Sequence, residues 1–321
     1  MPEHSSDNDS LNILLVIMGQ SPFNRSIWSG FLGGFKLLGH SVTVVDAREI
    51  PEPQELDHKP DLMFAVHGSN IPIDKVQAYR ADGIVTAVYL LDEPYEVDSS
   101  VEWSRHYDCV FSVDKATLPV HSLHTQAEHL PLAYDHRVFN PDGPIIASRI
   151  LVLGTPFDAR EKYLAAIRDR WGDLVTWVGP GWKNFSPTGT HYEGFVDPEA
   201  CAGFYRGADI IINIHRDPTW SHFGEHNKNA IEATHLNPRF WEVAGCRSFQ
   251  LCSYRGDIEM LAPQAIVFNS VEELVQKIDY FIDNEKARDK LARKVYSKVK
   301  PHTYEQRCKT VLEILKEPLI N

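Results

Sequence analysis

The chain has 321 residues, of which 43% are hydrophobic and 24% are charged, and its formal net charge is −12. This length is more typical of two domains than of one, and the apolar content suffices for two cores. Because proteins bind DNA and RNA through basic faces, the acidic balance argues against a nucleic-acid partner.

The remaining composition favours a cytoplasmic protein. No apolar stretch reaches the length that spans a bilayer, and the polar residues 1–10 have the character of neither a signal peptide nor a transit peptide. We expect these ten residues to form a disordered leader. The five cysteines are scattered and include no CxxC pair, which is typical of reduced thiols in a core.

The first half of the chain alternates unbroken apolar runs with helical patterns. Apolar runs at 11–18 and 42–46, separated by a helical pattern at 25–38, predict a right-handed βαβ unit with buried parallel strands. Further strands are predicted at 61–66, 84–90, 109–112 and 128–130, with a helix at 73–81.

Polar residues follow three of these strands. His67 follows the run at 61–66, Asp92 and Glu93 follow 84–90, and Asp114 follows 109–112. Open α/β sheets bind ligands at the carboxyl ends of their strands, so we expect these residues to line one edge of one sheet. The alternative is that each is an ordinary solvated loop residue.

A cluster of proline and glycine at 140–144 is the best candidate for a linker. The same alternation then starts again, with strands predicted at 150–153, 175–178, 210–214 and 265–268, and an apolar run at 248–252. Helices are predicted at 158–170, 198–206, 271–282, 287–299 and 302–316. We therefore expect an α/β chain with lobes at 11–145 and 146–300, and a C-terminal helix within 301–321 that packs back on the first lobe.

The clearest chemistry lies at residues 237–246. Asn237 suits a helix N-cap and Pro238 the first helical position, while Arg239 and Glu242 share the polar face of that helix. A helix N-terminus beside an arginine suits a diphosphate, and a carboxylate can accept bonds from both hydroxyls of a ribose. The alternative is a surface ion pair on an exposed helix.

Several motifs together resemble the GT-B glycosyltransferases, and more specifically the CgeB-like family related to the retaining type-4 enzymes. They are Leu-Asp-Glu-Pro-Tyr at 91–95, His-Leu-Pro-Leu-Ala at 129–133, Leu-Gly-Thr at 153–155, Val-Gly-Pro-Gly-Trp at 178–182, Asn-Ile-His-Arg at 213–216 and Asn-Pro-Arg-Phe at 237–240. The resemblance implies a GT-B architecture: two Rossmann-like parallel-sheet lobes facing a cleft, with the acceptor on the first lobe and a nucleotide sugar on the second.

The resemblance also implies a role for each matching residue. The diphosphate would be contacted by Gly154, Thr155 and Arg160, and the phosphate region supported by Arg239 and the helix starting at Asn237. The base would be bordered by Gly179 and Trp182, and the ribose hydroxyls bound by Glu242. At the edge of the first lobe, Asp92 and His67 are the catalytic candidates.

This chain departs from the family pattern at two positions. Thr234 stands where related transferases carry a second glutamate, and Arg247 stands where a glycine is usual. Either other groups, such as His215 or Lys228, replace the missing contacts, or the donor differs from the usual one.

The histidine-rich segment 215–235 resembles a metal site only loosely. His222, Glu225 and His226 have ligand-like spacing, but their order is not that of zinc hydrolases, and Gly224 makes a helix there unfavourable. We expect a loop there, no metal ion and no cofactor.

The expected function is sugar transfer from a nucleotide diphosphate sugar, expected to be a UDP-sugar, with retention and without a metal. The acceptor would be a saccharide, a protein or a small molecule. The alternatives are a GT-B protein that binds a nucleotide sugar or a partner without turnover, and a nucleotide-sugar epimerase.

Overall fold

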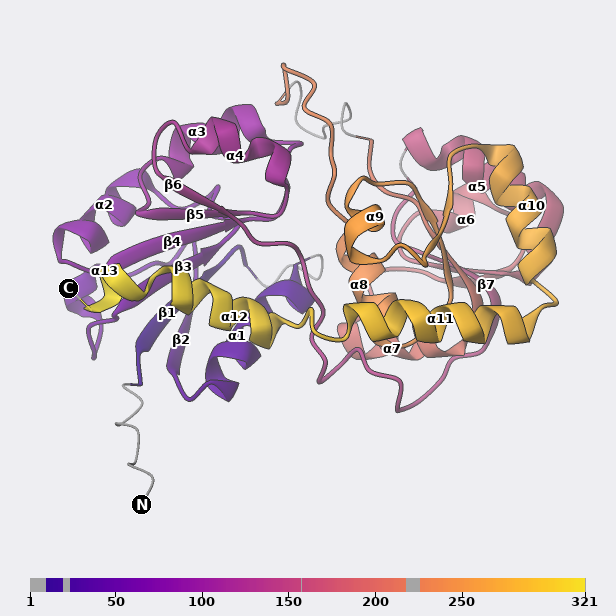
Figure 1. Cartoon of the computed structure of the whole chain (residues 1–321), viewed down its shortest axis with the longest axis horizontal. Coiled ribbons are helices and arrows are strands. Elements are labelled where there is room, and N and C mark those ends of the chain that lie inside the picture. The colour runs from indigo at the N-terminus through magenta and orange to yellow at the C-terminus, as the bar shows by residue number, and fades with distance from the viewer. Residues whose placement is uncertain (1–9, 20–23, 157, 218–225, 321) are drawn as a thin grey trace.

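The computed structural model describes residues 10–19, 24–156, 158–217 and 226–320. It contains two six-stranded parallel sheets, with strand orders β2-β1-β3-β4-β5-β6 and β12-β11-β10-β7-β8-β9. Figure 1 shows these sheets as two lobes side by side, the first in indigo and magenta and the second mostly in rose and orange. The predicted GT-B architecture is therefore confirmed.

The first lobe is built as the apolar runs predict. Its strands are β1 (Asn12–Ile17), β2 (Ser41–Asp46), β3 (Leu62–Val66), β4 (Val85–Leu90), β5 (Cys109–Ser112) and β6 (Gln126–His129). Its helices are α1 (Arg25–Leu37), α2 (Ile73–Ala81), α3 (Val97–Ser104) and α4 (Leu118–His121). Every residue of β3 and β5 is buried, because helices cover both faces of a parallel sheet.

The second lobe has the strands β7 (Ser148–Leu153), β8 (Val175–Val178), β9 (Thr190–Tyr192), β10 (Ala208–Asn213), β11 (Gln250–Ser253) and β12 (Ile266–Phe268). Its helices are α5 (Asp158–Trp171), α6 (Trp182–Phe185), α7 (Pro198–Gly207), α8 (Pro238–Gly245), α9 (Asp257–Leu261), α10 (Val271–Phe281) and α11 (Glu285–Val299). In this order β7 pairs with both β8 and β10, so the direction of winding reverses between β7 and β10. Ligands bind at such a reversal in open α/β sheets.

The C-terminal helices return to the first lobe. After α11, which lies on the second lobe, the yellow chain crosses and α12 (Tyr304–Ile314) packs against α1 (Figure 1). The fit is close: a Cβ on Gly30 would lie 2.2 Å from the Tyr304 ring, and a Cβ on Gly34 would lie 2.6 Å from Cys308 Sγ. The single predicted closing helix is in fact two, because α13 (Lys316–Ile320) follows α12.

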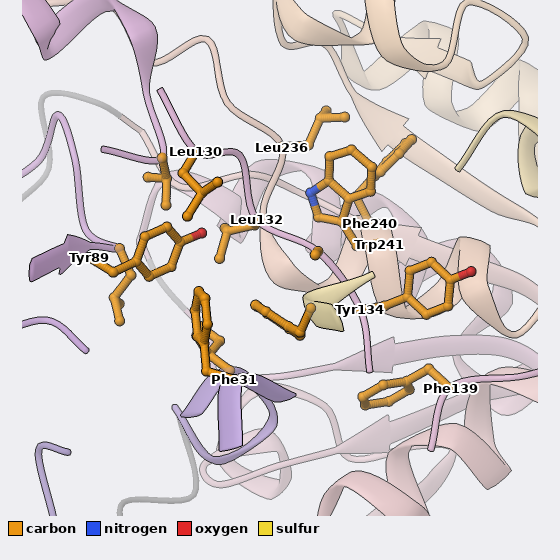
Figure 2. Close-up of a cluster of buried hydrophobic side chains, with 14 of the residues drawn as sticks. Phe31, Tyr89, Leu130, Leu132, Tyr134, Phe139, Leu236, Phe240 and Trp241 are labelled. Carbon is orange, nitrogen blue, oxygen red and sulfur yellow. The ribbon is translucent and has the colours of Figure 1, made fainter. Parts of the chain in front are cut away.

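One hydrophobic cluster contains buried residues of both lobes. Figure 2 shows Phe31, Tyr89, Leu130 and Leu132 of the first lobe with Leu236, Phe240 and Trp241 of the second, and Tyr134 and Phe139 of the connecting segment. Shared apolar burial of this kind stabilises one arrangement of the lobes. Among the described residues, no helix has the length and apolar character needed to cross a membrane.

A polar contact holds the lobes together beside this cluster. Asp114 follows β5 and is fully buried, and it accepts hydrogen bonds from Thr234 N (2.7 Å), Thr234 Oγ1 (2.9 Å), His235 Nδ1 (3.0 Å) and His235 N (3.2 Å) of the second lobe. Ala116 N donates a further bond of 2.9 Å. Next to it, Lys115 Nζ lies 2.9 Å from Asp257 Oδ1.

We expect Asp114→Asn to lower the free energy of unfolding by about 1–2 kcal/mol at neutral pH, because the charge is lost while the shape remains. Burial would raise the pKa of Asp114, but the bond and charge of His235 and the backbone bonds outweigh it and lower the pKa to about 2. A depressed pKa stabilises the fold above the ordinary value near 3.8, and that contribution is lost as the pH falls towards 2.

Urea unfolding at pH 7 and at pH 3 measures this effect, and the difference between Asp114→Asn and wild type should shrink at the lower pH. A difference that is equal at both pH values would contradict a role for the Asp114 charge.

Candidate active site

A cavity of about 270 Å³ lies at the carboxyl ends of β7 and β8, beside the N-terminus of α8. Seven of the eleven predicted site residues line it: Gly154, Thr155, Arg160, Gly179, Asn237, Arg239 and Glu242. Its other walls include Ser26 of α1, Phe195, Val196 and Tyr205. The structure therefore brings together residues that are far apart in the sequence, as expected for a reversal point.

Two glycines allow the loops of this cavity to meet. Gly154 has a φ of 128° and Gly179 a φ of 127°, a conformation that residues with a side chain rarely adopt. A Cβ on Gly179 would lie 2.0 Å from Gly154 O, and a Cβ on Gly154 would lie 2.7 Å from Arg239 Nη2. Any larger residue would push the loop away from the guanidinium.

The phosphate end of the cavity carries a helix N-terminus and two arginines. Asn237 caps α8, its Oδ1 accepting a bond of 2.9 Å from Phe240 N, as the sequence predicts. Arg239 Nε is buried without a hydrogen-bond partner among the described residues. Burial and the charge of Arg239 lower the pKa of Arg160 to about 9. Two close guanidinium groups at a helix N-terminus strongly favour an anion.

Glu242 is half-buried and contacts hydroxyl groups of two other helices. Its Oε1 accepts a bond of 2.8 Å from Ser26 Oγ of the first lobe, and its Oε2 accepts one of 3.2 Å from Tyr205 OH. Burial raises the pKa of Glu242, while the Ser26 bond and the charge of Arg239 oppose that rise. The alternative of a surface ion pair on an exposed helix is therefore wrong for Glu242, because α8 packs against both lobes.

Trp182 and His215 are donor-site predictions that do not line this cavity. Trp182 is 1% exposed, and its indole Nε1 donates to Gly154 O (2.8 Å) and Val178 O (3.1 Å). These bonds support the glycine loop, and a place for Trp182 beside a base stays a prediction. His215 is also buried, and its backbone N donates to Ser253 Oγ at 2.8 Å. Burial and the charge of Arg255 hold the pKa of His215 well below its ordinary value.

The catalytic candidates meet at the edge of the first sheet. His67 Nε2 lies 3.2 Å from Asp92 Oδ2 and 3.6 Å from Glu96 Oε2. Arg216 of the second lobe bonds Asp92 Oδ1 at 3.3 Å, and its guanidinium lies 4.4 Å from the centre of the Tyr95 ring. The shared sheet edge was predicted from the strand ends, and this grouping agrees with it.

Electrostatics couples these groups. Burial would raise the pKa of Asp92, but the bond and charge of His67, with the charge of Arg216, lower it below its ordinary value. Burial would likewise lower the pKa of His67, but the bond and charge of Asp92 raise it. Burial and the charge of Asp92 raise the pKa of Glu96. His67, Asp92 and Glu96 also form the one group with metal-ligand proximity within the described parts of the chain.

The two family departures have structural explanations. Thr234 donates two bonds to Asp114 and so ties the lobes together. Arg247 follows the end of α8 with a φ of 56°, in the left-handed region. Glycine adopts this conformation without steric cost, which explains the glycine expected at this position. The spacing noted at His222 and Glu225 lies outside the described residues, and of that group only His226 is described.

Sequence reasoning missed Ser26, Tyr205 and Glu96. Ser26 and Glu242 are 216 positions apart, and no motif connects them. Glu96 follows the Leu-Asp-Glu-Pro-Tyr motif directly and could have been included by extending that motif by one residue.

Comparisons with known proteins identify a similar family and a similar curated protein. Residues 160–313 match a family described as glycosyl transferase-like. The chain is 25% identical to spore protein CgeB of Bacillus subtilis (strain 168) over 258 residues, which are 76% of this chain and 78% of CgeB. The family and the fold support sugar transfer in general.

Solved structures share the fold. An alpha-glucosyltransferase in complex with UDP and a 13-mer DNA containing a central A:G mismatch has a TM-score of 0.67 at 13% identity, covering 96% of this chain and 100% of that one. Anabaena Alr3699/HepE in complex with UDP and glucose has a TM-score of 0.64 at 11% identity, covering 95% and 99%. The chain thus has the GT-B fold, is similar to spore protein CgeB, and matches a glycosyl transferase-like family over residues 160–313.

Proposed function

We propose that this protein transfers a sugar from a nucleotide diphosphate sugar, a UDP-sugar, to an acceptor hydroxyl at the edge of the first lobe, with retention at the anomeric carbon. One observation carries the proposal: a single cavity joins the N-terminus of α8 and the pair Arg160 and Arg239 to the carboxylate of Glu242. A nucleoside diphosphate offers matching groups, with an anionic diphosphate attached to a ribose that carries two hydroxyls.

In this reaction the acceptor oxygen forms a bond to the anomeric carbon, and the bond from that carbon to the terminal phosphate oxygen breaks. The nucleoside diphosphate leaves with the bonding pair, and the acceptor gives up one proton. The arginine pair and the helix N-terminus stabilise the charge that develops on the leaving phosphate. Asp92 orients the acceptor hydroxyl or takes its proton.

The acceptor we propose is a saccharide, a protein or a small molecule. The net charge of −12 disfavours a nucleic acid, even though structures of an alpha-glucosyltransferase with this fold were solved with DNA.

Incubating the protein with a panel of nucleotide sugars and acceptors tests the proposal. Release of nucleoside diphosphate together with a glycosylated product supports transfer. An isomerised donor would instead indicate an epimerase, and saturable binding without chemistry would indicate a binding protein without turnover.

Asp92→Ala should lower turnover by roughly tenfold and leave the affinity for donor nearly unchanged, because Asp92 lies outside the donor cavity. Steady-state kinetics with donor calorimetry measures both. Asp98→Ala is the matched control, since Asp98 also bonds across the lobes, accepting from Lys228 N at 2.7 Å, yet lies outside the His67 group. Equal losses in the two variants would assign Asp92 only a role in lobe contact.

We also propose that transfer needs no metal ion, because the arginine pair and the helix N-terminus can offset the charge of the leaving diphosphate. Turnover should therefore be unchanged after dialysis against EDTA. Loss of turnover with EDTA and its return with a divalent ion would refute this, and repeating the test in Glu96→Gln would show whether the His67 group binds that ion.

A further inference from the structure

Both oxygens of the Glu242 carboxylate are engaged by hydroxyl groups of the protein. Ser26 Oγ donates to Oε1 at 2.8 Å and Tyr205 OH donates to Oε2 at 3.2 Å. All three residues line the same cavity. The two hydroxyls come from different lobes, because Ser26 lies in α1 and Tyr205 in α7.

These bonds leave room for a ligand. Each carboxylate oxygen can accept about two hydrogen bonds, so one position on each oxygen remains after Ser26 and Tyr205 have donated. The two bonds also fix the orientation of the carboxylate, since a plane held at both ends cannot rotate about its terminal torsion. Tyr205 itself is 1% exposed, so its hydroxyl is held firmly by the core.

We propose that Ser26 and Tyr205 are positioning residues for ribose recognition, which hold the two Glu242 oxygens so that each can accept one hydroxyl of the ribose. This inference rests on the proposed nucleotide-sugar donor. It adds that Ser26 of the first lobe completes the ribose site. The second lobe by itself would therefore bind a ribose less tightly than the two lobes together.

The experiment compares UDP with 2′,3′-dideoxy-UDP by calorimetry in wild type, Ser26→Ala and Tyr205→Phe. Each substitution removes one hydroxyl group and is otherwise conservative. We expect each variant to bind UDP roughly 5- to 10-fold more weakly, and to bind the dideoxy nucleotide within about twofold of wild type. Ser26→Thr, which keeps the hydroxyl, should restore most of the affinity for UDP.

Two matched controls exclude a general loss of structure. Ser29→Ala removes a neighbouring hydroxyl of α1 that donates to Ser26 O at 3.5 Å, and Tyr163→Phe removes one that donates to Asn269 O at 3.2 Å. Neither residue lines the cavity, so both controls should bind UDP as wild type does.

The possible outcomes separate this inference from the proposed function. If wild type prefers UDP over the dideoxy nucleotide and the variants keep the full preference, the positioning role is wrong while the donor proposal stands. Equal weakening of both nucleotides would also overturn it, since that is the result of a purely structural role. If wild type binds no nucleoside diphosphate, both proposals fail.

Discussion

Glu242→Ala is expected to weaken the binding of UDP by roughly 30- to 800-fold. The carboxylate would accept two ribose hydroxyls, and hydrogen bonds to a charged group contribute about 1.5–3 kcal/mol each, less partial replacement by water. The resulting loss of about 2–4 kcal/mol converts to this range at 1.4 kcal/mol for each tenfold change. Calorimetry with UDP measures it directly.

The same substitution should also destabilise the fold, by about 1–2 kcal/mol, because it leaves the buried Tyr205 hydroxyl without its acceptor and breaks the cross-lobe bond from Ser26. Glu242→Gln keeps an oxygen for one of these donors and should lose less stability, while ribose binding still falls. Equal UDP affinity in wild type and Glu242→Ala would remove the basis of the donor site.

Arg160→Met is expected to weaken UDP binding by roughly 10- to 150-fold, the range for losing one charge-assisted contact of about 1.5–3 kcal/mol. The same substitution should not lower the stability of the fold. Burial and the charge of Arg239 lower the pKa of Arg160 to about 9, so both oppose the positive charge of its guanidinium in the folded protein. Without bound anion, the urea midpoint of Arg160→Met should therefore equal or exceed that of wild type.

Arg170→Met provides the control on the same helix. Arg170 Nη2 bonds Asp279 Oδ2 at 2.6 Å on the surface, away from the cavity, so this variant should bind UDP normally. If Arg160→Met lowers both the affinity for UDP and the urea midpoint, the guanidinium stabilises the fold, and its assignment to anion binding is contradicted.

The local pattern of the sequence determined most of the secondary structure. Apolar runs marked the strands because both faces of a parallel strand are buried, and α2 was predicted with its observed bounds, Ile73–Ala81. The cap at Asn237 was also predictable, since a side-chain oxygen three residues before a free backbone N–H satisfies it without any tertiary contact. The repeated alternation predicted two lobes.

Only the tertiary structure decided what the side chains of the site contact. Glu242 reads as an exposed residue on one helix, but the packing of α1 and α7 around α8 places Ser26 and Tyr205 on its carboxylate. Trp182 lies beside a glycine loop in the sequence, yet its large apolar ring is buried beneath that loop. Such contacts join residues far apart in the chain, and periodicity and capping report only on near neighbours, so no local pattern encodes them.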